Sequence, residues 1–138
     1  MEELKKISDI ILHYGDNGSS DSIDSLLQQR DELATLSFRL AEISSNSKRD
    51  YNGAYFIRKV NIARNIQELQ KQGMSYNKAD AESLIKNEKF YRNEILKEAE
   101  AYKMDLLLKQ CNKVLDAMSQ RISYMKQDAM KYENKTAY

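Results

Sequence analysis

The stretch Tyr76–Tyr132 reads YNKADAESLIKNEKFYRNEILKEAEAYKMDLLLKQCNKVLDAMSQRISYMKQDAMKY and contains neither Gly nor Pro. Gly and Pro interrupt helices more than any other residue, so the stretch predicts one continuous helix over residues 76–132. At 1.5 Å per residue this helix would be on the order of 85 Å long. A single domain of this chain length is narrower than that, so we expect part of the helix to project or to be covered by a partner.

One row of side chains at helical spacing is predicted to be the buried face of this helix. The row contains Leu84, Tyr91, Ile95, Ala99, Tyr102, Leu106, Val114, Met118, Ile122, Met125, Ala129 and Tyr132. It advances mostly by four residues, which gives a period near 3.7 and argues against a left-handed coiled coil with a repeat of seven.

The apolar surface of the long helix widens between residues 106 and 118. The additional residues are Leu107, Leu108, Cys111 and Leu115. One neighbouring helix cannot cover so wide an arc, so we expect either a third helix or self-association of two copies through these residues.

Three shorter helices are predicted before the long one, over residues 2–14, 22–44 and 54–72. The polar residues 44–53 end in Asn-Gly, which is typical of a turn, so we expect a break or hinge there. Gly73 follows Lys71 and predicts a helix end with Gly in the left-handed conformation, with Met74 making the accompanying hydrophobic contact. Asp21 or Ser22 is expected to cap the second helix, and Ser75 or Asn77 the helix after Gly73.

Composition supports the same fold class. The 138 residues include no Pro and only 4 Gly, with 31% charged and 41% hydrophobic residues. We therefore predict an all-α protein, an extended helical hairpin or bundle forming a single domain over residues 1–138. A short N-terminal helix and one very long C-terminal helix are its main features.

Charge and hydropathy restrict the classes of partner. The net charge is +1, but residues 1–47 carry −5 and residues 48–67 carry +4, which suggests an orienting field rather than bulk attraction to a polyanion. No apolar run approaches the roughly 20 residues that span a bilayer, and the first residues lack the apolar core of a signal peptide. With one cysteine, no internal disulfide can form, and we expect a protein of a reducing cytoplasm with no membrane contact.

The residues that could carry chemistry are few. Cys111 lies in an apolar stretch, and the only histidine, His13, is far from it in sequence, so neither forms a nucleophile with its base. Glu94, Glu98 and Glu100 cluster on the long helix but lack the histidines that usually complete a metal site in helical bundles. We predict no catalytic residue, no metal, no cofactor and no enzymatic activity.

Cations and aromatic residues alternate in one segment. They are Lys48, Arg49, Tyr51, Tyr55, Phe56, Arg58, Lys59 and Arg64. Lys and Arg can neutralise phosphates while Tyr51 or Tyr55 stacks on bases, so this segment is the candidate contact with single-stranded nucleic acid or with a protein partner. The alternative is ordinary: aromatic residues in the core and cations in solvent. Gln120, Arg121 and Tyr124 form a second candidate contact on the predicted exposed side of the long helix.

Two stretches resemble small helical proteins encoded in the early regions of bacteriophages and prophages. They are the turn Gly73–Asp80, GMSYNKAD, and the run Val114–Lys126, VLDAMSQRISYMK, and the resemblance extends over about residues 54–130. It is a likeness of pattern, without a specific motif. It implies an accessory role near the DNA metabolism of a phage and no catalytic residue.

Three functions remain open at this point. The chain could be an accessory protein of recombination or replication that contacts single-stranded DNA or the proteins on it. It could be an anti-defence inhibitor of the anti-CRISPR type, whose acidic residues Asp9, Asp16, Asp21, Asp24, Asp31 and Glu32 engage a nucleoprotein enzyme. It could also be a structural protein that only self-associates, for example as a homodimer.

Overall fold

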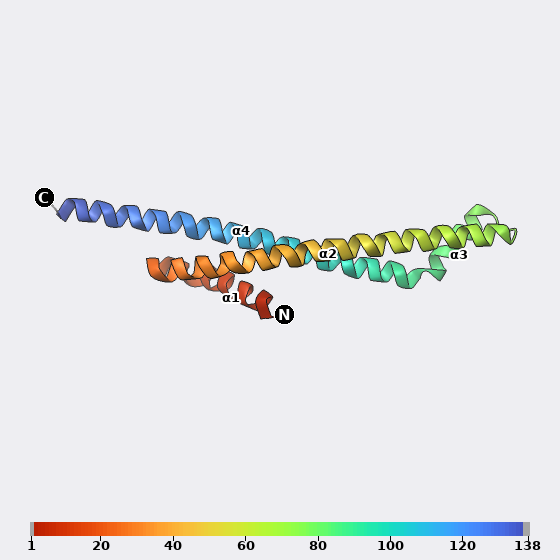
Figure 1. The fold of residues 1–138 in the computed structure, drawn as a ribbon, viewed down its shortest axis with the longest axis horizontal. Coiled ribbons are helices and arrows are strands. Elements are labelled where there is room, and N and C mark those ends of the chain that lie inside the picture. Colours follow the sequence, from red (N-terminus) through yellow and green to blue (C-terminus); the bar gives the residue numbers. More distant parts are fainter. Residues whose placement is uncertain (1, 137–138) are drawn as a thin grey trace. The chain divides into compact units, whose positions relative to one another are not determined.

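The computed structural model describes residues 2–136, except for the side chains of Ser19 and of residues 134–136. Its helices are α1 (Glu2–Asn17), α2 (Ile23–Lys71), α3 (Tyr76–Lys86) and α4 (Glu88–Thr136), with one 3-10 turn at Gly18–Ser20 (Figure 1). The prediction of an all-α protein with a short N-terminal and a long C-terminal helix is confirmed. The described residues form two compact units, and both α2 and α4 pass through each of them.

The first unit consists of Met1–Glu42 and Leu106–Tyr138. Its core is apolar and is supplied by α1, the start of α2 and the later part of α4. The buried side chains are Ile7, Leu26, Leu33, Leu40, Cys111, Met118 and Ile122. An ion pair of 2.6 Å from Arg39 Nη2 to Glu3 Oε1 also ties α1 to α2. Three helical segments therefore share this core, which accounts for the wide apolar arc of α4 in this part.

The second unit is Ile43–Asp105, which contains the later part of α2, the whole of α3 and the start of α4. Here α2 and α4 lie side by side and run antiparallel (Figure 1). Lys48 contacts Asp105 and Arg58 contacts Glu94, so residue numbers rise along one helix as they fall along the other. The buried residues are mostly small or polar: Ser44, Ser47, Ala54, Ala79, Ser83, Asn87, Glu94, Ala101 and Met104.

The expected break over residues 44–53 is absent, because α2 is continuous from Ile23 to Lys71. Ser44, Ser47 and Ala54 are buried on its inner face, and 40, 47 and 54 continue the seven-residue spacing of the core leucines. Gly73 is the only described residue with a positive φ, so Gly53 takes no special conformation. Packing of these small side chains therefore overrides the local turn preference of Asn52-Gly53.

The predicted helix over residues 76–132 is instead divided at Asn87, where α3 ends and α4 begins one residue later. Asn87 has φ −104° and ψ 17°, and its side-chain Nδ2 donates a 2.8 Å hydrogen bond to the carbonyl of Ser83. A buried Asn that bonds the backbone of the preceding turn competes with helical hydrogen bonding. The side-chain bond of Asn87 thus explains why the helix is interrupted between α3 and α4 although the stretch contains neither Gly nor Pro.

The turn between α2 and α3 follows the sequence prediction. The N–H of Gly73 bonds the carbonyl of Gln70, the N–H of Met74 bonds that of Leu69, and Gly73 has φ +91°. This is the Schellman arrangement that ends helices at a glycine. Ser75 then caps α3, since its Oγ accepts from the N–H of Lys78, and Ser22 caps α2 by accepting from the N–H of Ser25.

The predicted buried row of the long helix is wrong in the second unit. Leu84, Tyr91, Ile95 and Tyr102 are exposed, between 47% and 66%. The buried positions repeat strictly by seven, as 87, 94 and 101 and again as 104, 111 and 118, which is the period of left-handed coiled-coil packing. Tyr55 and Phe56 of α2 are also exposed, so the alternative that places these aromatic residues in the core is wrong for both. The most apolar row of α4 therefore faces outward here, and small or polar residues face α2.

Candidate binding face

Two outward tyrosines of the second unit, Tyr55 and Tyr91, lie beside Arg58. Its guanidinium lies 5.4 Å from the ring centre of Tyr55 on α2 and 4.9 Å from that of Tyr91 on α4. It also forms a two-pronged ion pair with Glu94, in which the Nη2–Oε1 distance is 3.2 Å. Both side chains of the pair are largely buried. The hydrogen bond with Glu94 raises the pKa of Arg58, so the guanidinium is a permanent charge at this position.

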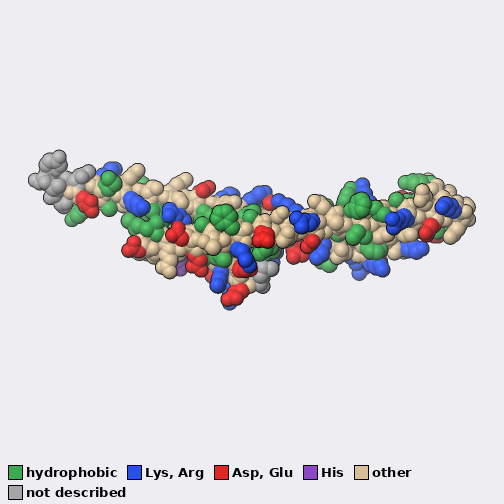
Figure 2. Space-filling model, in the orientation of Figure 1, with side chains coloured by type: hydrophobic (Ala, Val, Ile, Leu, Met, Phe, Trp, Pro, Cys, Tyr) green, Lys and Arg blue, Asp and Glu red, His purple; other side chains and the backbone are tan. Residues whose placement is uncertain are grey.

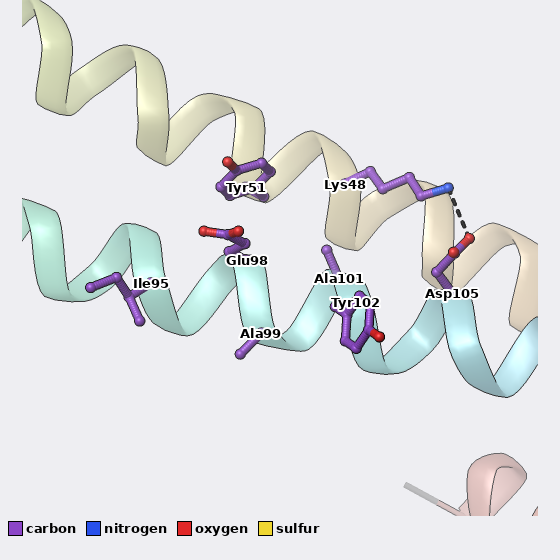
Figure 3. Close-up of a pocket in the computed structure, with 8 residues that line it drawn as sticks. All are labelled: Lys48, Tyr51, Ile95, Glu98, Ala99, Ala101, Tyr102 and Asp105. Atoms are coloured by element: carbon purple, nitrogen blue, oxygen red, sulfur yellow. Dashed lines mark hydrogen bonds and ion pairs between the residues drawn. The ribbon is translucent and has the colours of Figure 1, made fainter.

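A shallow open groove of about 560 Å³ lies between α2 and α4 on the same side of the unit. Its lining residues are Lys48, Tyr51, Ile95, Glu98, Ala99, Ala101, Tyr102 and Asp105 (Figure 3). Lys48 Nζ contacts Asp105 Oδ1 at 3.2 Å at one end of the groove, and Tyr51 lies over Glu98 in the middle (Figure 3). The pKa of Tyr51 is raised, first by burial and then by the negative charge of Glu98.

We call this surface the tyrosine-rich face, defined by Tyr51, Tyr55, Tyr91, Ile95 and Tyr102. Hydrophobic side chains at the surface lie among Lys and Arg side chains over the part of the molecule that holds α3 and the adjoining α2 and α4 (Figure 2). The charged residues on or next to the face are Lys48, Arg58, Lys59, Arg92, Glu88, Glu94, Glu98 and Asp105. These four positive and four negative charges balance, and Lys103 next to Tyr102 adds one positive charge.

The structure divides the predicted basic segment between different surroundings. Lys48 and Arg58 are paired with carboxylates, and the Lys59 ammonium lies 4.9 Å from the ring centre of Tyr55. Arg49 and Arg64 are exposed and form no ion pair with any residue the structure describes. Since successive helical residues are about 100° apart, these two arginines lie on other sides of α2 than Lys48.

The remaining predicted residues lie in the first unit. Gln120 and Tyr124 are exposed and Arg121 is half-buried on α4. Leu107, Leu108 and Leu115 are half-buried, whereas Cys111 is fully buried with its Sγ 4.0 Å from the carbonyl oxygen of Leu33. Burial raises the pKa of the Cys111 thiol. Cys111 is thus part of the core of this unit and presents nothing to a second copy.

The other candidate groups have ordinary structural surroundings. His13 Nε2 lies 3.1 Å from Oδ2 of Asp21, two residues before the start of α2. Glu94 points inward to Arg58, while Glu98 and Glu100 are exposed. No group of three or more His, Cys, Asp or Glu among the described residues could hold a metal ion. Among residues 2–136, no helix has both the length and the apolarity that crossing a bilayer requires.

Sequence reasoning missed Ile95 and Tyr102 as surface residues, because the apolar row of α4 was assigned to the core, and it did not predict that Glu98 lies beside Tyr51. The signal that could have found them was the seven-residue spacing of Asn87, Glu94 and Ala101, which share a helix face with little hydrophobicity. Comparisons with other proteins add no assignment: no protein-family model, no curated protein and no solved structure matches this chain.

Proposed function

We propose that this chain is a non-enzymatic binding protein whose partner is a protein held against the tyrosine-rich face. One observation carries the proposal: the second unit buries small and polar residues and leaves Tyr91, Ile95 and Tyr102 exposed. Tyr and Arg are the residues most enriched among the energetic hot spots of protein interfaces. An exposed group of tyrosines next to an arginine is therefore typical of an interaction surface.

The charge of the face favours a protein over a nucleic acid. Binding to a phosphate backbone depends on cations that displace counterions. Here Lys48 and Arg58 are already neutralised within the chain, and Glu98 lies beside Tyr51 where a stacked base would bring its phosphates. Aromatic groups between balanced charges instead suit the polar rim and apolar centre of a protein interface.

The resemblance of residues 54–130 to phage early-region proteins suggests the cellular process in which this binding takes place. The resemblance implies an accessory role in phage recombination or replication, and we infer that the complex formed through this face acts on the nucleic-acid machinery of a bacterial cytoplasm. An anti-defence inhibitor of the anti-CRISPR type is the alternative. Both roles require a protein contact, and they differ in whether the bound machine is helped or blocked.

Site-specific photocrosslinking tests the protein contact. Benzoyl-phenylalanine is placed at position 91 or 102 on the tyrosine-rich face, and at Gln67, an exposed residue of α2, as the control. Covalent adducts to protein at positions 91 and 102, absent at 67 and competed away by excess unlabelled chain, are the expected result. Adducts of equal yield at all three positions would overturn the assignment of this face.

Direct contact with single-stranded nucleic acid is a second candidate function, favoured by the exposed Arg49 and Arg64. The second unit also carries twelve Lys and Arg against nine Asp and Glu, a net charge of +3. Fluorescence anisotropy with labelled single-stranded DNA and RNA at low and high salt tests it. Salt-sensitive binding that disappears in the Arg49→Glu, Arg64→Glu double variant would establish this contact, and no binding at low salt would remove it.

A further inference from the structure

On the outer side of α4 between Glu88 and Lys103, the apolar and charged side chains are arranged so that the surface is complementary to a second, antiparallel copy of itself. Glu88, Ile95 and Tyr102 are seven residues apart, so they form one line along the helix over four turns. Tyr91 and Glu98 flank this line on one side, and Arg92 and Ala99 flank it on the other. All seven side chains are exposed, and Ile95 is 52% exposed at the centre of the line.

Consider a two-fold axis that is perpendicular to α4 at Ile95 and relates the helix to α4 of a second copy. Each residue that precedes Ile95 by n positions then lies level with the residue of the other copy that follows Ile95 by n positions. In that antiparallel pair, Ile95 meets Ile95 of the other copy, and the carboxylate of Glu88 lies beside the hydroxyl of Tyr102. Glu88 also comes next to Lys103 on the same flank. The phenol of Tyr91 comes next to the carboxylate of Glu98, to which it can donate. The carboxylates of Glu88 and Glu98 thus each meet a cation or a hydrogen-bond donor of the other copy, and Arg92 lies beside Ala99.

The parallel arrangement lacks this match. It would set Glu88 against Glu88, Arg92 against Arg92 and Glu98 against Glu98, and like charges placed across an interface are destabilising. The sequence of α4 therefore distinguishes one orientation from the other. Self-complementarity of this kind is what a two-fold interface requires, because the same patch serves both copies.

Two further observations fit an interface at this place. Tyr91 is already held in position by the guanidinium of Arg58 at 4.9 Å, so little side-chain freedom is lost when it is covered. The Glu88–Arg92 ion pair of 2.7 Å joins residues four apart on α4 and is largely exposed. Exposed pairs of this type are weak, so Glu88 can exchange its partner for Lys103 of a second copy at little cost.

We propose that the protein covering the tyrosine-rich face is a second copy of this chain, paired through antiparallel α4 helices with Ile95 on the two-fold axis. This inference rests on the proposed function, because it names the partner of the same face. It places self-association at residues 88–103, away from Leu107, Leu108, Cys111 and Leu115.

The state of association is measured first, by sedimentation equilibrium over a wide range of concentrations. The full chain should show a monomer–dimer equilibrium, and Ile95→Glu should weaken it by about tenfold or more, because two carboxylates would meet on the axis. Leu96→Glu is the matched control. Leu96 follows Ile95, is 69% exposed and points about 100° away from it around the helix. The Leu96→Glu variant should therefore dimerise nearly as well as the parent chain. A chain that stays monomeric throughout would overturn the inference.

Orientation is tested by charge reversal and by disulfide trapping. Glu88→Lys and Lys103→Glu should each weaken the dimer, and the double variant should restore it. In a Cys111→Ala background, Ile95→Cys should form an intermolecular disulfide under mild oxidation. Tyr102→Cys should not, because its two copies would be about 21 Å apart along the helix axis. Trapping at 102 but not at 95 would overturn the antiparallel pairing.

The two proposals fail in different ways. A monomeric chain whose positions 91 and 102 crosslink to a different protein would overturn the homodimer and leave the proposed function intact. A monomeric chain without crosslinks on this face would overturn both.

Discussion

Arg58 is the residue that connects the interior of the second unit to its surface, because it pairs with Glu94 inside and touches Tyr55 and Tyr91 outside. Arg58→Met would leave Glu94 buried without its partner, and breaking a buried pair in this way costs about 3 kcal/mol. Urea denaturation should show that loss. The double variant Arg58→Met, Glu94→Leu should recover most of it, since no charge is then left buried. A single variant as stable as the parent would contradict this role for the pair.

Tyr51 provides a pH-dependent observable on the same face. Its pKa is raised above 10.0 by burial and by Glu98, so the folded state holds the phenolic proton more tightly than the unfolded state does. That contribution to stability is complete below the unfolded pKa and is lost as pH rises through the folded pKa. In difference titrations of phenolate absorbance against Tyr51→Phe, the phenol of Tyr51 should ionise above the ordinary range. Glu98→Gln should move it down, whereas Glu100→Gln should not.

Prediction from the sequence succeeds for single residues where one residue determines the local backbone. Gly73 is such a case, because a left-handed φ at a helix end favours Gly, and so is Ser75, whose hydroxyl caps α3. It fails for Glu94, whose carboxylate was assigned to solvent. A charged side chain enters a helix interface only if its partner is there, and Arg58 is 36 residues away in sequence.

Among the helices, α2 shows the same limit and offers a direct test. Gly53 lies in its middle, exposed and with free space around an added Cβ, whereas Gly73 has φ +91°. Gly53→Ala should therefore raise the free energy of unfolding by about 1 kcal/mol through helix propensity and a less flexible unfolded chain. Gly73→Ala should lower it by about as much, because Ala is strained at positive φ. Equal effects of the two substitutions in denaturant unfolding would contradict a continuous α2.

The inner face of α2 contains a second element-level weakness at Ser44. Its hydroxyl is buried and has no hydrogen-bond partner among the described residues. Ser44→Ala should stabilise the protein by about 1 kcal/mol, since a buried unsatisfied hydroxyl is removed and Ala is the better helix former. The control Ser45→Ala, one residue away and exposed, should gain only the helix-propensity part, about half as much. Thermal unfolding of both variants distinguishes the two contributions.

The all-α class could be predicted because helical periodicity is visible in any single segment. Which row of α4 faces inward could not, because two rows compete. The outer one, with Tyr91, Ile95 and Tyr102, is the more apolar, and hydrophobicity alone selects it. The inner one, with Asn87 and Ala101, is selected by close packing of small residues against α2. That information lies in the pairing of helices, which no single segment contains.

In the molecule as a whole, the two units differ in what stabilises them. The first unit buries long apolar side chains such as Leu26, Leu33 and Met118, and the second buries Ser47, Ala54 and other small groups. Burial free energy grows with the apolar area removed from water, at about 25 cal/mol per Å². The second unit therefore has the smaller hydrophobic contribution and the more exposed aromatic surface.

Hydrogen exchange should reveal that difference. Amides of residues 43–72 and 76–105 should exchange faster than those of residues 26–40 and 111–122, by roughly tenfold or more, because local opening follows the regions with few apolar contacts. Dimerisation through Ile95 should slow amide exchange of residues 88–103. The protection of these amides should therefore rise with protein concentration in the parent chain but not in the Ile95→Glu variant. Uniform exchange rates along α2 and α4 would mean that the two units open as one. Faster exchange in the second unit, together with protection of residues 88–103 on association, would show that the tyrosine-rich face lies on the less stable unit and that dimerisation stabilises this unit.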